Sequence, residues 1–85
     1  MPKICRWHGI VIEMFYPDHP PPHFHALYSE FEARIAIDPL TVLTCDLPRP
    51  VLREVLAWAA LRRAELLENW DLCRRNLPLR PITPP

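Results

Sequence analysis

The chain has 85 residues, of which 49% are hydrophobic and 24% charged, and its formal net charge is zero. This length fits one domain with one modest core, and the composition is that of a globular protein. A single glycine excludes a glycine-rich phosphate loop, and the lone Ser29 lacks the context of a nucleophile elbow. Three cysteines, odd in number and far apart, fit neither a disulfide framework nor a zinc knuckle.

The charges are unevenly distributed along the chain. Residues 1–46 carry three basic and six acidic side chains, whereas residues 47–85 carry seven arginines and four acids, a net +3. A net charge of +3 is too small to indicate a nucleic-acid-binding surface, so nucleic acid is only a weakly supported partner. No apolar run approaches the roughly 18 residues that span a bilayer, and the first residues lack a signal core. We expect a cytoplasmic protein without a membrane segment.

Short segments rich in β-branched and aromatic residues, several of them alternating, predict a small antiparallel sheet in the first half of the chain. His8 and Gly9 suit a tight turn and predict a hairpin between the first two segments. In the third segment, alternation places His23 and His25 on the same face. The expected strands are residues 3–7, 9–16, 23–28, 32–38 and 41–45.

The hydrophobic period changes in the second half of the chain. From about Leu47 to Asn76, apolar residues recur at three- and four-residue spacings, which predicts one long amphipathic helix. Such a helix is longer than a globule of this size is wide. It therefore either breaks near Arg62–Arg63 or projects onto a partner or a second copy of the chain.

These elements predict an α+β fold. It is a small, mostly antiparallel sheet of four or five short strands, with one long C-terminal amphipathic helix packed on one face. We assign residues 1–77 to a single domain and residues 78–85 to a proline-rich extended tail.

The stretch DHPPPHFHA, from Asp18 to Ala26, holds three of the four histidines. A straight polyproline path would put His19 about 12 Å from His23, unless the loop bends. His23 and His25 project from one face about 7 Å apart, close enough to share a metal ion or a phosphate. One interpretation is a site for a divalent metal such as zinc, with ligands from His19, His23, His25 and Asp18, or with Glu13 as a further ligand.

Two other interpretations of this stretch remain open. His23 and His25 can act as acid and base in phosphodiester cleavage near neutral pH. Alternatively, the histidines only hold the proline loop in place. A weaker hypothesis assigns phosphate or partner binding to arginines of the helix, although such arginines are more often a solvated face. They are Arg49, Arg53, Arg62 and Arg63.

Several segments together resemble a small bacterial family, the domain of unknown function 4160. They are MPKI at the start, GIVIEMFYPDHPPPHFHA from Gly9, DLP from Asp46, VLAWA from Val55, ELLENW from Glu65 and the closing PLRPITP. The family signature falls on Asp18, His19, Pro21, Pro22, His23, Phe24, His25 and Ala26, and its helical part on Trp58, Glu65, Leu66, Asn69 and Trp70. Cys45 and Arg62 depart from the pattern, which has glycine and histidine there.

Members of this family are commonly encoded beside another short protein, in an arrangement like a toxin–antitoxin pair. The resemblance implies a small partner protein from the adjacent gene. We therefore expect a bacterial toxin–antitoxin-like protein that acts through this partner, with the histidine cluster as its functional surface. The alternatives are a small ribonuclease that uses His23 and His25, and a metal-binding or DNA-binding regulator. Whether the protein is an enzyme stays open at this point.

Overall fold

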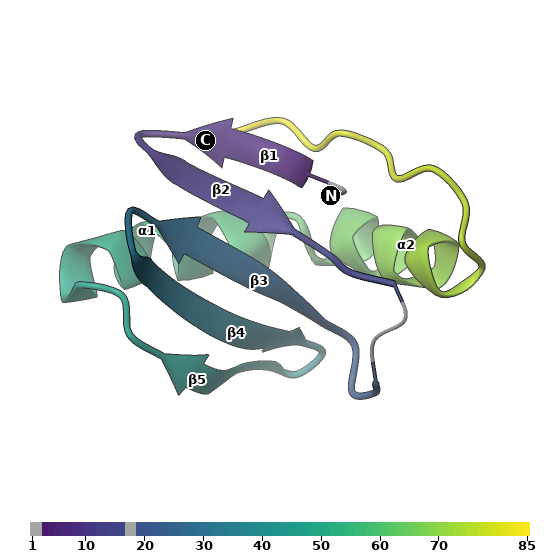
Figure 1. The fold of residues 1–85 in the computed structure, drawn as a ribbon, viewed down its shortest axis with the longest axis horizontal. Helices are drawn as coiled ribbons and strands as arrows, with labels where there is room; N and C mark the ends of the chain where they lie inside the picture. Colours follow the sequence, from purple (N-terminus) through teal and green to yellow (C-terminus); the bar gives the residue numbers. More distant parts are fainter. Residues whose placement is uncertain (1–2, 17–18) are drawn as a thin grey trace.

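The structure, a computed structural model, describes residues 3–16 and 19–85. One sheet carries all five strands in the order in which they occur along the chain, and every neighbouring pair is antiparallel. Two helices follow and pack behind the sheet (Figure 1). The elements are β1 (Lys3–Trp7), β2 (Ile10–Glu13), β3 (His23–Tyr28), β4 (Phe31–Ile37), β5 (Leu40–Cys45), α1 (Arg49–Leu61) and α2 (Arg63–Arg74).

Tight turns set the register of the sheet. His8 and Gly9 join β1 to β2 with φ of 47° and 78°, the left-handed pair that a two-residue type I′ hairpin requires. Ser29, with φ of 55°, opens the turn between β3 and β4. The predicted hairpin at His8–Gly9 is confirmed. The second strand ends at Glu13, earlier than expected, because the chain then leaves the ladder for the proline loop.

The core lies between the sheet and the helices. Its sheet side consists of alternate residues of β2, β3 and β4, and its helix side of Val55, Trp58, Ala59 and Leu66. Phe24 of β3 meets Trp58 of α1 edge to face, with ring centroids 6.1 Å apart. Alternate residues of the central strands therefore point into this core, and the residues between them point to the opposite face of the sheet.

The prediction of one long helix is wrong, and the alternative of a break near Arg62–Arg63 is confirmed. The helical region breaks at Arg62, whose φ of −120° is not helical. An unbroken helix from residue 47 to 76 would measure about 45 Å, whereas the longest dimension of the molecule is 33 Å. The periodicity would also place Arg62 on the buried stripe between Ala59 and Leu66. The break lets the Arg62 guanidinium reach Glu65 at 3.3 Å instead.

The proline-rich tail is extended and runs back past α2 to β1 (Figure 1). The Ile82 amide donates a hydrogen bond to the Ile4 carbonyl at 3.0 Å, and the Ile82 side chain is buried in the core. Asn69 holds Arg80 by two reciprocal hydrogen bonds of 2.8 Å, and the Trp58 indole donates to the Thr83 carbonyl. The tail thus packs as part of the domain. Neither helix has the length and apolarity to span a bilayer in the described part of the chain.

Candidate functional site: the histidine cluster on strand β3

Strand β3 positions two of the histidines from the proline-rich stretch. His23 begins the strand opposite Ala36 of β4, and His25 lies between Glu13 of β2 and Arg34 of β4. Because Phe24 points into the core, His25 points to the opposite face of the sheet. Both residues are nevertheless mostly buried, at 5% and 9% exposure. The ring of Phe15, in the loop after β2, packs edge-on against His25 with centroids 4.5 Å apart.

A carboxylate fixes the His25 ring. His25 Nδ1 lies 2.9 Å from Glu32 Oε2. Arg34 is the β4 residue directly opposite His25, and Glu32 precedes Arg34 by two residues on the same strand. The imidazole side chain is 11% exposed, whereas that of Glu32 is 49% exposed. The ionised carboxylate only accepts hydrogen bonds, so Nδ1 is the donor, and Nε2 is the acceptor atom of the neutral ring.

A backbone carbonyl fixes the His23 ring in the same tautomer. His23 Nδ1 donates to the Pro21 carbonyl oxygen at 2.8 Å, which again makes Nε2 the acceptor atom of the neutral ring. The ring lies between those of His25 and Trp70, at centroid distances of 5.3 and 5.2 Å. Trp70 comes from α2, so this contact links the histidines to the helix layer. The peptide bond between Pro20 and Pro21 is cis.

Glu13 lies directly beside His25 in the ladder and is 4% exposed. Its Oε1 atom is buried without a hydrogen-bond partner among the described residues. His19 is exposed on the proline loop, and Asp18 lies outside the described residues. Within residues 3–16 and 19–85, no three His, Cys, Asp or Glu side chains stand in metal-binding geometry.

A polar hollow adjoins the histidines. It has a volume of about 340 Å³ and lies beside the start of β4 and the end of β5. Glu32 belongs both to this hollow and to the hydrogen bond with His25, so the two features form one surface. The lining residues are Glu30, Glu32, Arg34, Thr44, Cys45 and Asp46.

The four arginines singled out in the sequence lie on the helices and at the break between them. Arg49 and Arg53 are exposed on α1. Arg62 pairs with Glu65, and Arg63 pairs with Asp38 at 2.8 Å. Because the helices cover the face opposite to His25, these arginines belong to the other layer of the fold (Figure 1).

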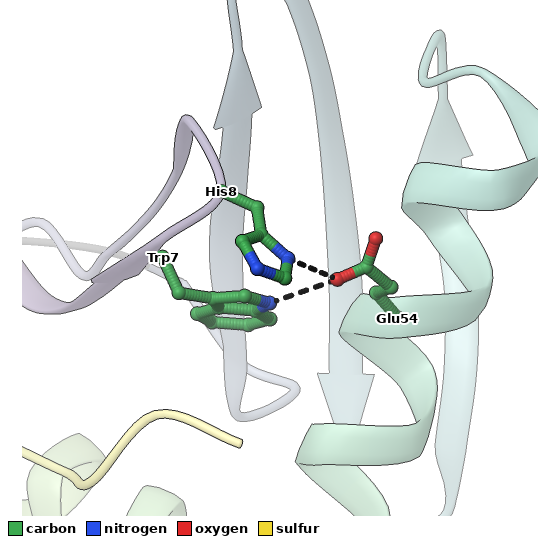
Figure 2. A network of polar contacts seen from close by, with 3 residues as sticks. All are labelled: Trp7, His8 and Glu54. Carbon is green, nitrogen blue, oxygen red and sulfur yellow. Dashed lines mark hydrogen bonds and ion pairs between the residues drawn. The ribbon is translucent and has the colours of Figure 1, made fainter.

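The fourth histidine forms a second histidine–glutamate pair, between the β1–β2 hairpin and α1. Figure 2 shows one Glu54 carboxylate oxygen accepting from Trp7 Nε1 at 3.2 Å and lying 3.0 Å from His8 Nδ1. Both hydrogen bonds lower the pKa of Glu54, and the one to His8 has the larger effect. The His8 side chain is 76% exposed, so this pair ties the first hairpin to α1 at the surface.

Sequence reasoning did not single out Glu32, Arg34 or the contact between Trp70 and His23. For the first two, the register decides. The observed two-residue turn at Ser29 places Arg34 opposite His25 and Glu32 one diagonal away, whereas the expected strands left a three-residue connection. The approach of α2 to His23 depends on where the helix breaks. The sequence offered a break near Arg62–Arg63, but it did not indicate that Trp70 would then reach His23.

Comparison with known proteins adds one match. The model of the family described as Domain of unknown function (DUF4160) matches residues 9–71. The chain belongs to this family. The match includes the loop, the strand that carries both histidines, and both helices almost to the end of α2. No curated protein and no solved structure matches the chain.

Proposed function

We propose that this protein is a cytoplasmic protein-binding module, one member of a toxin–antitoxin-like pair, and that its partner docks on the histidine surface. We define this surface as His23, His25, Glu32 and Arg34. The observation that carries the proposal is the His25–Glu32 pair. A largely buried imidazole holds a carboxylate that is half exposed at the rim of an open hollow.

This arrangement suits recognition because the exposed group is already oriented. His25 fixes Glu32 through a 2.9 Å hydrogen bond, and Phe15 and His23 hold the His25 ring from two sides. A preorganised side chain loses less conformational entropy on binding than a mobile one. In this interpretation Glu32 and Arg34 contact the partner, and His25 positions Glu32.

Co-expression with the product of the adjacent gene tests the proposal. The wild-type chain should copurify with that product as a stable complex. His25→Ala and Glu32→Gln should each weaken the complex at least about tenfold, a loss typical of an anchoring polar contact.

The matched control for this experiment is His8→Asn, which removes the other histidine–glutamate pair while keeping a residue that tolerates a positive φ. It should bind as the wild type does, and circular dichroism should show all variants folded. Equal weakening by His8→Asn, or recovery of two separate proteins from the wild type, would contradict the proposal.

A second candidate function, RNA cleavage, is favoured by one observation. The ring centroids of His23 and His25 lie 5.3 Å apart, and each ring forms its hydrogen bond through Nδ1. Two imidazoles this close can act on the same substrate, one as acid and one as base. Arg34, opposite His25, supplies a cation for phosphate. Purified wild type should then cleave RNA, and both His23→Ala and His25→Ala should abolish cleavage. Intact RNA after incubation with the wild type would eliminate this candidate.

The metal-binding regulator is tested on the same preparations. Mass spectrometry of untagged protein should find about one transition-metal ion per chain if the proline loop holds a ligand set, and none in a His23→Ala, His25→Ala double variant. A metal-free wild type would restrict the histidines to positioning or acid–base roles.

A further inference from the structure

The two edges of the sheet differ in what covers them. Strand β1 forms one edge, and the tail lies along it, with the Ile82 amide bonded to the Ile4 carbonyl. Strand β5 forms the other edge, and five of its six residues are exposed. No other described segment pairs with β5 on its outer side. The outer backbone groups of β5 are therefore available to a sixth strand.

The side chains of β5 do not protect this edge. Natural edge strands usually carry lysine, other charges or proline, which prevent another strand from pairing with them. The segment LTVLTC has none of these, and Val42 and Leu43 are 37% and 43% exposed. The ladder contains one bulge, a register shift that leaves Leu43 without a partner in β4. A bulge limits pairing locally, so the charge and proline protection is what this edge lacks. An apolar, uncharged edge of this kind is typical of a site for strand addition.

The hollow beside this edge supplies a charge. Its lining holds three carboxylates, from Glu30, Glu32 and Asp46, against one guanidinium, from Arg34. The Asp46 amide donates to the Glu32 carbonyl at 2.9 Å, which extends the ladder to the hollow. A strand added to β5 would run past these carboxylates. Basic side chains on that strand would complement them.

We propose that β5 accepts an extended basic segment of a partner protein as a sixth strand, with lysine or arginine side chains over Glu30, Glu32 and Asp46. This inference rests on the proposed function and names the shape and charge of the partner's binding segment. A second copy of the chain is a poorer occupant. Its β5, LTVLTC, contains no lysine or arginine, so a copy paired through this strand would bring no cation to the three carboxylates.

A pair of substitutions at Leu43 isolates the charge. Leu43→Lys and Leu43→Glu remove the same apolar side chain from the same exposed position and differ in sign. With the adjacent gene's product as partner, Leu43→Lys should raise Kd at least about tenfold, whereas Leu43→Glu should bind at least as tightly as the wild type. Kd should also rise with salt concentration for the wild type. Equal weakening by both substitutions would overturn the proposal.

A second measurement addresses the edge without the natural partner. A synthetic peptide of alternating lysine and valine, titrated into labelled protein, should shift the amide resonances of Leu40–Cys45, and a glutamate–valine peptide should not. Shifts with both peptides or with neither overturn the basic-strand inference, even if the co-expressed complex forms. Failure of the wild type to form that complex overturns the proposed function, whatever the peptides do. A wild-type dimer that Leu43→Lys dissociates would assign the edge to a second copy and overturn the inference.

Discussion

Replacing Asn69 with aspartate should release the tail from the helix layer. Asn69 is 1% exposed, and its amide donates to the Arg80 carbonyl while its oxygen accepts from the Arg80 amide, both at 2.8 Å. Aspartate keeps the acceptor but replaces the donor with a charged oxygen that faces the carbonyl. An unsatisfied buried acceptor costs about 1–3 kcal/mol, and the buried charge adds to this cost. We expect a loss of at least about 2 kcal/mol at pH 7.

Urea unfolding followed by tryptophan fluorescence measures this loss, and the melting temperature should fall by roughly 10 °C. Asn76→Asp is the control, because it makes the same change at an exposed residue whose side chain forms no hydrogen bond with any described residue. Amide exchange at Ile82, which is bonded to Ile4, should accelerate only in the Asn69 variant. A difference of less than about 0.5 kcal/mol between the two variants would refute the role of this clamp.

Three further predictions concern other parts of the fold. Gly9→Ala places a side chain at φ of +78° and should lower the free energy of unfolding by about 1 kcal/mol, measured in urea. Because hydrogen bonds lower the pKa of Glu54, its stabilising effect is present above the usual carboxylate pKa and is lost as pH falls through the lowered value. Glu54→Gln should therefore destabilise the protein at pH 7 and converge with the wild type at low pH; a constant difference would contradict this. Burial raises the pKa of Cys5, whereas Cys45 is exposed, so a thiol reagent should modify Cys45 first, as peptide mapping would show.

The strands could be predicted because their pattern is local. Alternation placed each strand within a few residues of its observed position, and the His8–Gly9 pair fixed the first hairpin. For the helical region the sequence left two alternatives, a break near Arg62–Arg63 or a projecting helix, because apolar residues recur on both sides of these arginines. The cost of burying Arg62 on the stripe and the limited width of the sheet oppose one continuous helix. These two effects appear only when the helix is packed against the sheet.

The candidate site was predictable to the same limited extent. The i, i+2 spacing correctly predicts that His23 and His25 lie next to each other on one face of a strand, and their ring centroids are 5.3 Å apart. The sequence did not indicate which residues would cover the two histidines. Phe15 covers His25 from the loop, and Trp70 reaches His23 from α2. These contacts join residues far apart in the chain, so no periodicity encodes them.

The tail connects the stability of the domain to the choice of binding edge. Pro78–Pro85 reads in the sequence as an appendage, yet the core includes Ile82, and Asn69 and Trp58 bind the tail backbone. By lying along β1, the tail protects the edge that the helices leave open on that side (Figure 1). No described segment protects β5 in this way. An antiparallel meander of five strands must have two edges, and this chain covers one with its own residues. The uncovered edge is the one beside the acidic hollow and the His25–Glu32 pair, where we place the partner.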